Sequence, residues 1–434
     1  MVAGTTGTIG ATGKPSSLKT TGEVAKPSEI EPWATLLVLQ ASPFCNINCD
    51  YCYLPNRTST RRMSMQVLAS AIEKTYASDL VRGELTIIWH AGEPLAVPIS
   101  WYEEALATIS VTAPTEANIV HSIQSNGTLL NQRWCDFIKS HDIRVGLSID
   151  GPDFLHDLHR KTRRGDGSHR AAMRGLQLLK DNDIPFHVIA VITSEALGHA
   201  QEIYDFFETA GVERLGFNIE EVEAEHAVST LGARHEERVR QFYQTIFENQ
   251  KRRGSITIRE FAAAEQKIRS GISLREFDFP WFNEQVRPFG IVSVDSEGNF
   301  STYSPELLGM SLQPYGEFCF GNVLRDHFAD ALETPKFRQA LADIQTGIKR
   351  CAETCSYYGY CGAGAPANKY YENGSFATTQ TLYCRYAVQM PLDIVLSDIE
   401  SALNQPPDRR VKGKPGRLGC AKRVILPRCA STTC

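Results

Sequence analysis

Three cysteines in the first part of the chain are spaced so that they could hold a metal–sulfur centre. Cys45, Cys49 and Cys52 follow the pattern C-x3-C-x2-C, directly after a short apolar run at 36–40. Three thiolates can bind three irons of a [4Fe–4S] cluster and leave the fourth iron open to a small molecule, whereas four thiolates would close the cluster. A zinc site lacking one ligand is the alternative, but no second cysteine pair follows within about eighty residues. The spacing therefore predicts a cluster with one open iron.

Short polar segments follow the next three apolar runs, and their side chains suit the binding of a small charged molecule. The residues concerned are Gly92 and Glu93, then Ser125 and Asn126, then Ser148, Asp150 and Arg160. Glu93 can accept from an ammonium group, and Arg160 can pair with a carboxylate through two hydrogen bonds. Each segment alone reads as an ordinary turn. Their recurrence after consecutive apolar runs favours one shared cofactor-binding site.

The elements that must position these residues alternate between two patterns of hydrophobicity. Short apolar runs predict strands, and amphipathic segments with a period near 3.6 predict helices. The predicted strands are 34–41, 85–90, 118–123, 143–149, 186–192 and 213–218, and the predicted helices are 64–80, 99–110, 131–140, 168–181, 199–209 and 233–251. Such alternation favours parallel strands with right-handed crossovers. We therefore expect an α/β fold, a partial (β/α)6 barrel over 31–255, with its site on the loops that follow the strands.

Length and composition limit the classes of function. The 434 residues suffice for two domains, and 42% apolar and 22% charged residues are ordinary for a globular protein. The net charge of −5 gives no general attraction to nucleic acid or anionic membranes, and no apolar run reaches the length of a membrane helix. No secretory signal is visible, and twelve cysteines in such a chain favour metal ligands over disulfides. We expect a cytoplasmic protein with no nucleic-acid or membrane partner.

A second cysteine group lies in the C-terminal part of the chain, after the alternation stops near 255. This part reads as a hairpin over 289–303 and helices over 334–348 and 387–403. It contains four cysteines that could form one further metal centre: Cys351, Cys355, Cys361 and Cys384. Zinc is the alternative to an iron–sulfur cluster for this set. Residues 256–404 are thus predicted to form a linker and a small metal-binding domain.

The remaining cysteines and the two ends of the chain are expected to have other roles. Cys135 falls in an apolar helix and reads as a core residue, and Cys319, between two phenylalanines, suits a buried structural thiol. Residues 1–30 and 405–434 have little to bury, so a disordered leader and a basic disordered tail are expected, with no separate leader-binding domain. The tail cysteines, which are Cys420, Cys429 and Cys434, match no common cluster spacing.

Residues 35–220 resemble the core of radical S-adenosylmethionine (radical SAM) enzymes, first of all through the three-cysteine pattern. The resemblance implies that these cysteines bind a [4Fe–4S] cluster and that Tyr51 packs on the adenine of S-adenosylmethionine (SAM). It also implies that 90–94 (His-Ala-Gly-Glu-Pro, with alanine in place of a glycine) receives the methionine amino group. The run Ser-x-Asp-Gly-Pro with His-Asp-Leu-x-Arg is shared with anaerobic sulfatase-maturating enzymes, which implies SAM contacts for Ser148 and Arg160.

Residues 289–390 resemble the SPASM domain, which houses auxiliary iron–sulfur clusters. Here the usual hairpin cysteine is absent, the first cysteine spacing is three rather than two, and Ala365 stands in place of a fourth closely spaced cysteine. The resemblance therefore implies one auxiliary [4Fe–4S] cluster on the four-cysteine set, with two clusters as the alternative.

Short matches at 90–98, 304–309, 321–323 and 361–369 are similar to maturases that install cyclophane cross-links in ribosomally made peptides, including glycine-rich repeat precursors. Such enzymes cleave SAM to a 5′-deoxyadenosyl radical and join an aromatic ring carbon to a nearby Cβ in a precursor peptide. Their implied partners are that peptide and an electron donor such as a flavodoxin or ferredoxin. Sulfatase maturases carry an aspartate as base where this chain has Ser304, so Glu306 is the expected catalytic base.

Two alternatives to this function remain open from the sequence. One is formylglycine formation in a sulfatase, which the missing cysteines and aspartate disfavour. The other is a non-catalytic iron–sulfur or zinc scaffold, which would not cleave SAM after reduction. The sequence identifies neither the precursor peptide, nor its cross-linked residues, nor the oligomeric state.

Overall fold

The apolar runs between the polar segments form a parallel sheet in the computed structural model, which describes residues 33–270 and 283–404. The strands are β1 (Ala34–Leu39), β2 (Val81–Trp89), β3 (Asn118–Ser125), β4 (Arg144–Ser148), β5 (Phe186–Ile192) and β6 (Arg214–Ile219). They pair in sequence order, each parallel to the next. All six predicted strands are thereby confirmed. The expectations for 1–30 and 405–434, including Cys420, Cys429 and Cys434, lie outside the described residues.

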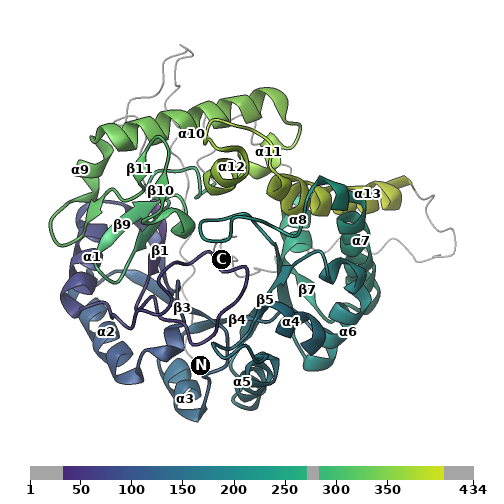
Figure 1. The fold of residues 1–434 in the computed structure, drawn as a ribbon, viewed down its shortest axis with the longest axis horizontal. Coiled ribbons are helices and arrows are strands. Elements are labelled where there is room, and N and C mark those ends of the chain that lie inside the picture. Colours follow the sequence, from purple (N-terminus) through teal and green to yellow (C-terminus); the bar gives the residue numbers. More distant parts are fainter. Residues whose placement is uncertain (1–32, 271–282, 405–434) are drawn as a thin grey trace, which may run out of the picture.

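Helices follow the strands and cover the outer side of the sheet, as Figure 1 shows. They are α1 (Met65–Ala77), α2 (Ile99–Thr112), α3 (Gln132–Ser140), α4 (Asp153–His159), α5 (His169–Asp181), α6 (Ala200–Ala210) and α7 (Glu236–Arg253). Capping residues mark where two of these helices begin. Ser64 caps α1 by accepting from Val67 N–H, and Asn131 caps α3 by accepting from Trp134 N–H. The six predicted helices are confirmed. The short α4, which was not predicted, comes directly after the Asp-Gly-Pro turn.

The β/α alternation runs one unit further than the sequence indicated. A two-residue strand, β7 (Thr257–Ile258), pairs parallel with β6 and leads into α8 (Arg259–Ser270). The expectation that alternation stops near 255 is therefore wrong by this unit. Two residues are too few to give a detectable hydrophobic period.

The predicted C-terminal hairpin is present and extends the barrel sheet. Strands β8 (Ile291–Val294) and β9 (Asn299–Thr302) are antiparallel, and β8 pairs parallel with β1. With β12 (Gly321–Asn322) at one edge and β7 at the other, the sheet has ten strands in the order β12-β9-β8-β1-β2-β3-β4-β5-β6-β7. A separate two-stranded sheet joins β10 (Ser311–Leu312) to β11 (Gly316–Glu317).

The remaining helices lie across the open side of the barrel, between the β1 side and the α8 side in Figure 1. They are α9 (Phe328–Leu332), α10 (Pro335–Thr354), α11 (Tyr358–Cys361), α12 (Pro366–Asn373) and α13 (Met390–Asn404), with a π-helical segment at Cys384–Gln389 before α13. Helix α13 packs on α8 and α7. The cysteine-rich segment is thereby held beside the end of the barrel sheet.

The two faces of β1 have different surroundings, because successive side chains of a strand point to opposite sides. Leu37 and Leu39 belong to the large core that the sheet shares with its helices. Leu36 and Val38 form a small separate cluster with Ile88 and Ile291. Among the described residues, no helix combines the length and hydrophobicity needed to span a membrane.

Candidate functional site

The loop that carries Cys45, Cys49 and Cys52, here called the three-cysteine loop, follows β1 and is fixed by backbone hydrogen bonds. Cys45 N–H donates to the Arg57 carbonyl at 3.1 Å, which closes the loop on itself. Asn48 N–H donates to the Lys161 carbonyl at 2.6 Å, which ties the loop to the segment after α4. The loop is therefore set in place by two parts of the chain more than a hundred residues apart.

The three thiols lie near enough to act on one another electrostatically. Burial raises the pKa of Cys45 and of Cys49 to about 12, and the neighbouring thiol of Cys52 adds to each rise. Protonated thiols of this kind release their protons when they bind metal, because the thiolate is the ligand. Within 33–270 and 283–404, no three Cys, His, Asp or Glu side chains converge closely enough to hold a single metal ion.

Cys45 is joined to the segment after β3 through Asn126. The Asn126 amide nitrogen lies 3.8 Å from the Cys45 sulfur and donates to the Asn46 side-chain oxygen at 2.9 Å. The Asn126 backbone N–H donates to a Glu93 carboxylate oxygen at 2.8 Å. The segments after β1, β2 and β3, predicted to share a site, are thus brought together.

The carboxylate of Glu93 is buried and already engaged by the protein. Its Oε1 accepts from Ser125 Oγ at 2.8 Å and from Leu95 N–H at 2.9 Å, in addition to the bond from Asn126. Burial raises the pKa of Glu93 to about 6, and the three hydrogen bonds oppose the rise. In this structure Glu93 and Ser125 brace the loop, so the expected acceptance of an ammonium by the Glu93 side chain remains a prediction.

Gly92 allows the close approach of two loops. Its φ is +125°, and a Cβ at this position would lie 2.2 Å from the Ser42 carbonyl oxygen. Glu93 N–H donates to the Phe44 carbonyl at 2.8 Å directly beside it. The glycine of the 90–94 segment is therefore required by backbone geometry next to the three-cysteine loop.

Cys49 is joined to the segment after β4 through a buried ion pair. Arg160 Nε lies 2.9 Å from Asp150 Oδ2, and Arg160 Nη1 lies 4.0 Å from the Cys49 sulfur. Burial alone would raise the pKa of Asp150, but the Arg160 guanidinium outweighs burial and keeps it below its ordinary value. Tyr51 OH donates to the same Asp150 oxygen, and the guanidinium carbon lies 5.3 Å from the centre of the Tyr51 ring.

These contacts place the predicted cofactor-binding residues that follow β1 to β4 around one loop. Ser148 also lies at the end of β4, where its Oγ accepts from the Gln124 amide at 3.0 Å. The roles of Tyr51 on adenine and of Ser148 and Arg160 on SAM remain predictions. A cavity of about 430 Å³ opens beside this site, between the three-cysteine loop and the β8–β9 hairpin, and its lining includes Ala91, Leu54 and Ser293.

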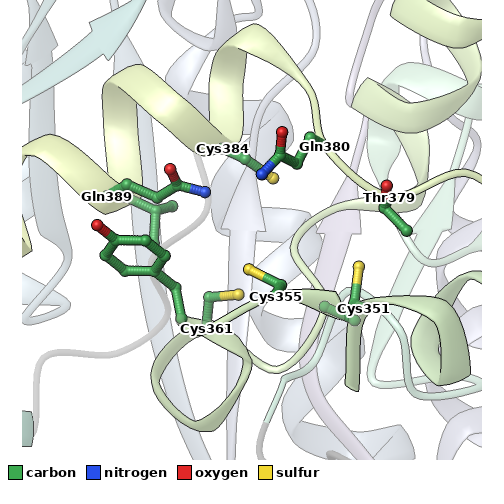
Figure 2. A pocket seen from close by; sticks show the side chains of 10 residues that line it. Cys351, Cys355, Cys361, Thr379, Gln380, Cys384 and Gln389 are labelled. Carbon is green, nitrogen blue, oxygen red and sulfur yellow. The ribbon is translucent and has the colours of Figure 1, made fainter. Parts of the chain in front are cut away.

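The other four cysteines, Cys351, Cys355, Cys361 and Cys384, line a second, separate pocket and are here called the four-cysteine set. Figure 2 shows their sulfur atoms pointing toward a common space. Cys351 lies in the last turn of α10, Cys355 directly follows α10, Cys361 ends α11, and Cys384 begins the π-helical segment. Burial raises the pKa of Cys361 to about 12, and the thiol of Cys384 adds to the rise. Four thiols around one pocket fit a closed [4Fe–4S] cluster.

The two cysteines that were expected to be structural lie elsewhere. Cys135 is fully buried, with its sulfur 3.9 Å from the Leu178 carbonyl oxygen. Cys319 donates to the Gly321 carbonyl at 3.2 Å and does not line the pocket of the four-cysteine set. Cys135 is therefore a core residue, as expected, whereas Cys319 is only partly buried and is not the buried thiol that was expected.

Three carboxyl groups that act on one another electrostatically form a further set, and sequence reasoning found only one of its members. Glu306 lies in a 3₁₀ turn after β9, whereas Glu221 and Glu223 lie in the loop after β6. Burial raises the pKa of Glu221 and of Glu306 to about 7, and the charge of Glu221 adds to the rise at Glu306. Burial also raises the pKa of Glu223 well above its ordinary value, and the charges of Glu221 and Glu306 add to that rise. Glu223 is also within electrostatic range of Cys52. We call these three residues the carboxyl set.

Hydrogen bonds from the C-terminal region orient the carboxyl set. Ser304 Oγ donates to the Glu306 carboxylate, and Tyr371 OH donates to the Glu306 carbonyl at 3.1 Å. The Asn368 amide donates to the carboxylate of Glu221. Polar residues after β6 were a signal of the same kind as those after β1 to β4, and applying that rule once more would have identified Glu221 and Glu223.

Comparison with known proteins gives matches along most of the chain. The model of the radical SAM superfamily matches residues 39–207. An uncharacterized protein of Synechocystis sp. is 41% identical over 374 residues, which cover 85% of this chain and 92% of that protein. A serine-type anaerobic sulfatase-maturating enzyme of Klebsiella aerogenes is 35% identical over 184 residues, 42% of this chain and 45% of that enzyme. This chain thus matches less than half the length of that maturase.

Two solved structures have a similar fold. The structure titled native anSMEcpe with bound AdoMet and Cp18Cys peptide has a TM-score of 0.69 at 20% identity, covering 86% of this chain and 99% of the other. Streptococcus suis SuiB bound to precursor peptide SuiA has a TM-score of 0.59 at 14% identity, covering 82% and 76%. At these identities the likeness concerns the fold.

Proposed function

Residues 39–207 form a radical SAM domain, and from this premise we propose that the chain forms carbon–carbon cyclophane cross-links in a ribosomally made precursor peptide. It is a radical SAM enzyme whose sequence is similar to that of a sulfatase-maturating enzyme over part of the length, and its fold is similar to those of anSMEcpe and SuiB. The specific product is our proposal. The observations that carry it are the four-cysteine set and Ser304, which stands where sulfatase maturases have an aspartate.

Joining an aromatic ring carbon to a Cβ removes two hydrogens from the peptide. One leaves as a hydrogen atom, the other as a proton, and one electron must also leave for the ring to regain aromaticity. The [4Fe–4S] cluster on Cys45, Cys49 and Cys52 and SAM supply, when bound, the 5′-deoxyadenosyl radical that takes the hydrogen atom. The remaining requirements are a proton acceptor and an electron acceptor near the same cavity.

The carboxyl set supplies the proton acceptor in this proposal. A base works best when its pKa is near the working pH, and Glu306, with a pKa of about 7, meets this condition. Glu221 and Glu223 lie close enough to share the accepted proton, because their charges act on each other and on Glu306. The four-cysteine set, with one auxiliary [4Fe–4S] cluster, supplies the electron acceptor.

Residues near the three-cysteine loop hold SAM and its cluster in this proposal. The Asp150–Arg160 pair fixes Tyr51 and approaches Cys49, and the Glu93–Ser125–Asn126 group approaches Cys45. The cavity beside the loop receives the precursor peptide. A small reduced electron carrier, such as a flavodoxin or ferredoxin, delivers the first electron.

Formylglycine formation in a sulfatase is the second candidate, favoured by the 35% identity to a sulfatase-maturating enzyme. That reaction also needs a base and an electron acceptor, so the carboxyl set does not separate the two. The cyclophane proposal is supported by the single set of four cysteines and by Ser304 at the position where sulfatase maturases have an aspartate.

The two reactions differ in the connectivity of the product. Formylglycine formed from cysteine exchanges sulfur for oxygen, whereas formylglycine formed from serine loses the same pair of hydrogens as a cyclophane but leaves a linear peptide with an aldehyde. We propose anaerobic co-expression with a precursor peptide encoded beside the enzyme, followed by tandem mass spectrometry. A cyclophane product loses one pair of hydrogens per modified motif and resists fragmentation within the ring. A product that exchanged sulfur for oxygen, or that fragmented freely across the motif, would contradict the cyclophane proposal and favour formylglycine chemistry.

A further inference from the structure

We propose that Lys369 is a positioning residue that raises the reduction potential of the auxiliary cluster by holding a buried positive charge against the four-cysteine set. The proposal rests on the assignment of an auxiliary cluster under the proposed function. It concerns a residue that is not a ligand and that lies outside the site around the three-cysteine loop.

The position of Lys369 is unusual for a lysine. Lys369 is 2% exposed, and it is the only buried lysine in the described ranges. Lysine is almost never fully buried unless its charge is paired. The Lys369 ammonium lies 3.4 Å from the Cys351 sulfur, and its charge acts on Cys384 as well. A buried charge paired with thiolate ligands is thus part of this site.

Helix α10 leaves space for the Lys369 ammonium at Gly347. Gly347 lies within the 20-residue helix α10, where glycine costs roughly 0.5–1 kcal/mol relative to alanine. A Cβ at Gly347 would lie 2.3 Å from the Phe376 carbonyl oxygen and 3.1 Å from the Lys369 nitrogen. Any side chain there would press on both the chain and the ammonium. The helix therefore carries a glycine where the lysine charge is housed.

The physical effect of this charge follows from its environment. Reduction adds one negative charge to a cluster, and a nearby positive charge stabilises the reduced form. Coulomb interactions are much stronger in a buried site than in water, because the effective dielectric constant is lower. Hydrogen bonds to the sulfurs and local charge are among the factors that set cluster potentials. A neutral side chain at 369 should therefore make the auxiliary cluster harder to reduce and a weaker electron acceptor.

The test is a potentiometric titration followed by electron paramagnetic resonance. The full chain is used with Cys45, Cys49 and Cys52 replaced by alanine, so that the auxiliary cluster gives the only signal. Lys369→Met and Lys369→Gln remove the charge, and Lys369→Arg keeps it. Lys349→Met is the matched control, because Lys349 lies on α10 with its side chain 74% exposed.

The expected result is a lower midpoint potential for both neutral variants, equivalent to at least a tenfold change in the reduction equilibrium, or about 59 mV for one electron. Lys369→Arg and Lys349→Met should stay near the parent value. An unchanged midpoint in a neutral variant that retains its cluster would overturn the proposal. Loss of iron from both neutral variants but not from Lys369→Arg would also overturn it, because the charge would then hold the cluster rather than tune it.

Failure of the underlying assignment gives a different result. If the parent protein with the three alanines contained no reducible cluster, the auxiliary-cluster assignment itself would be wrong. If the cluster is present and its potential does not respond to residue 369, only the role of Lys369 is rejected.

Discussion

Asn368 and Lys369 are neighbours on α12, yet they contact two different sites. The Asn368 amide donates to Glu221 of the carboxyl set, whereas the Lys369 ammonium lies 3.4 Å from Cys351 of the four-cysteine set. Tyr371, on the same helix, donates to the Glu306 carbonyl. One short helix thus connects the proposed proton acceptor to the proposed electron acceptor.

Replacing Cys45, Cys49 and Cys52 together by alanine should abolish SAM cleavage. Only thiolates at these positions can bind the irons of the first cluster, so iron and sulfide should each fall by one cluster's content. The measurements are 5′-deoxyadenosine formation and iron and sulfide analysis after anaerobic reconstitution. Cys135→Ala is the control, since Cys135 is buried in the core. Continued 5′-deoxyadenosine formation by the triple variant would contradict the proposed site.

Product formation should increase as the pH rises through about 7. A carboxyl group accepts a proton only when it is ionised, and burial raises the pKa of Glu306 to about 7. Below that pKa the ionised fraction, and with it the rate, should fall roughly tenfold per pH unit. Glu221 and Glu223 titrate together with Glu306, so the observed pKa belongs to the set.

Glu306→Gln tests that pH dependence directly. It should lower the rate of cross-linking by about 10²–10⁴-fold and remove the rise near pH 7, while 5′-deoxyadenosine formation continues. Glu317→Gln is the matched control, because Glu317 is an exposed residue lining the neighbouring cavity. A Glu306→Gln enzyme with the parent pH profile would show that the base lies elsewhere.

Gly92→Ala should destabilise the site because of its backbone conformation. At a φ of +125° an alanine is strained, and its Cβ would lie 2.2 Å from the Ser42 carbonyl oxygen. We expect a loss of at least about 1–3 kcal/mol in the free energy of unfolding, measured by urea denaturation, together with weaker SAM binding. Gly83→Ala is the control, since a Cβ there meets no atom within 4 Å. Equal stability of the two variants would contradict this reading of the loop.

Asp150→Ala should be strongly destabilising, because it leaves the Arg160 guanidinium buried without its partner. The side chains of this pair are 5% and 9% exposed, and removing one partner of a buried pair costs about 3–5 kcal/mol. The exposed pair Arg269–Glu265 is the comparison: Glu265→Ala should cost no more than about 1 kcal/mol. Thermal or urea unfolding of both variants measures the difference. Similar losses would show that burial does not set the strength of the Asp150 pair.

The sequence by itself determined the barrel and indicated the cysteines that are proposed as cluster ligands. Hydrophobic periods identify strands and helices because burial on one face is a local requirement, and the six strands from β1 to β6 were found in this way. The spacing of Cys45, Cys49 and Cys52 was visible because all three lie on one loop. The β7–α8 unit was missed, since two residues carry no period.

Only the tertiary structure decided which distant residues meet. Glu221, Glu306 and Asn368 are far apart in the chain, and they come together because the C-terminal region lies across the open side of the barrel. The burial that raises the pKa of Glu306 and encloses Lys369 depends on the same packing. Burial and electrostatic coupling arise from groups supplied by several elements, so no local pattern in the sequence could specify them.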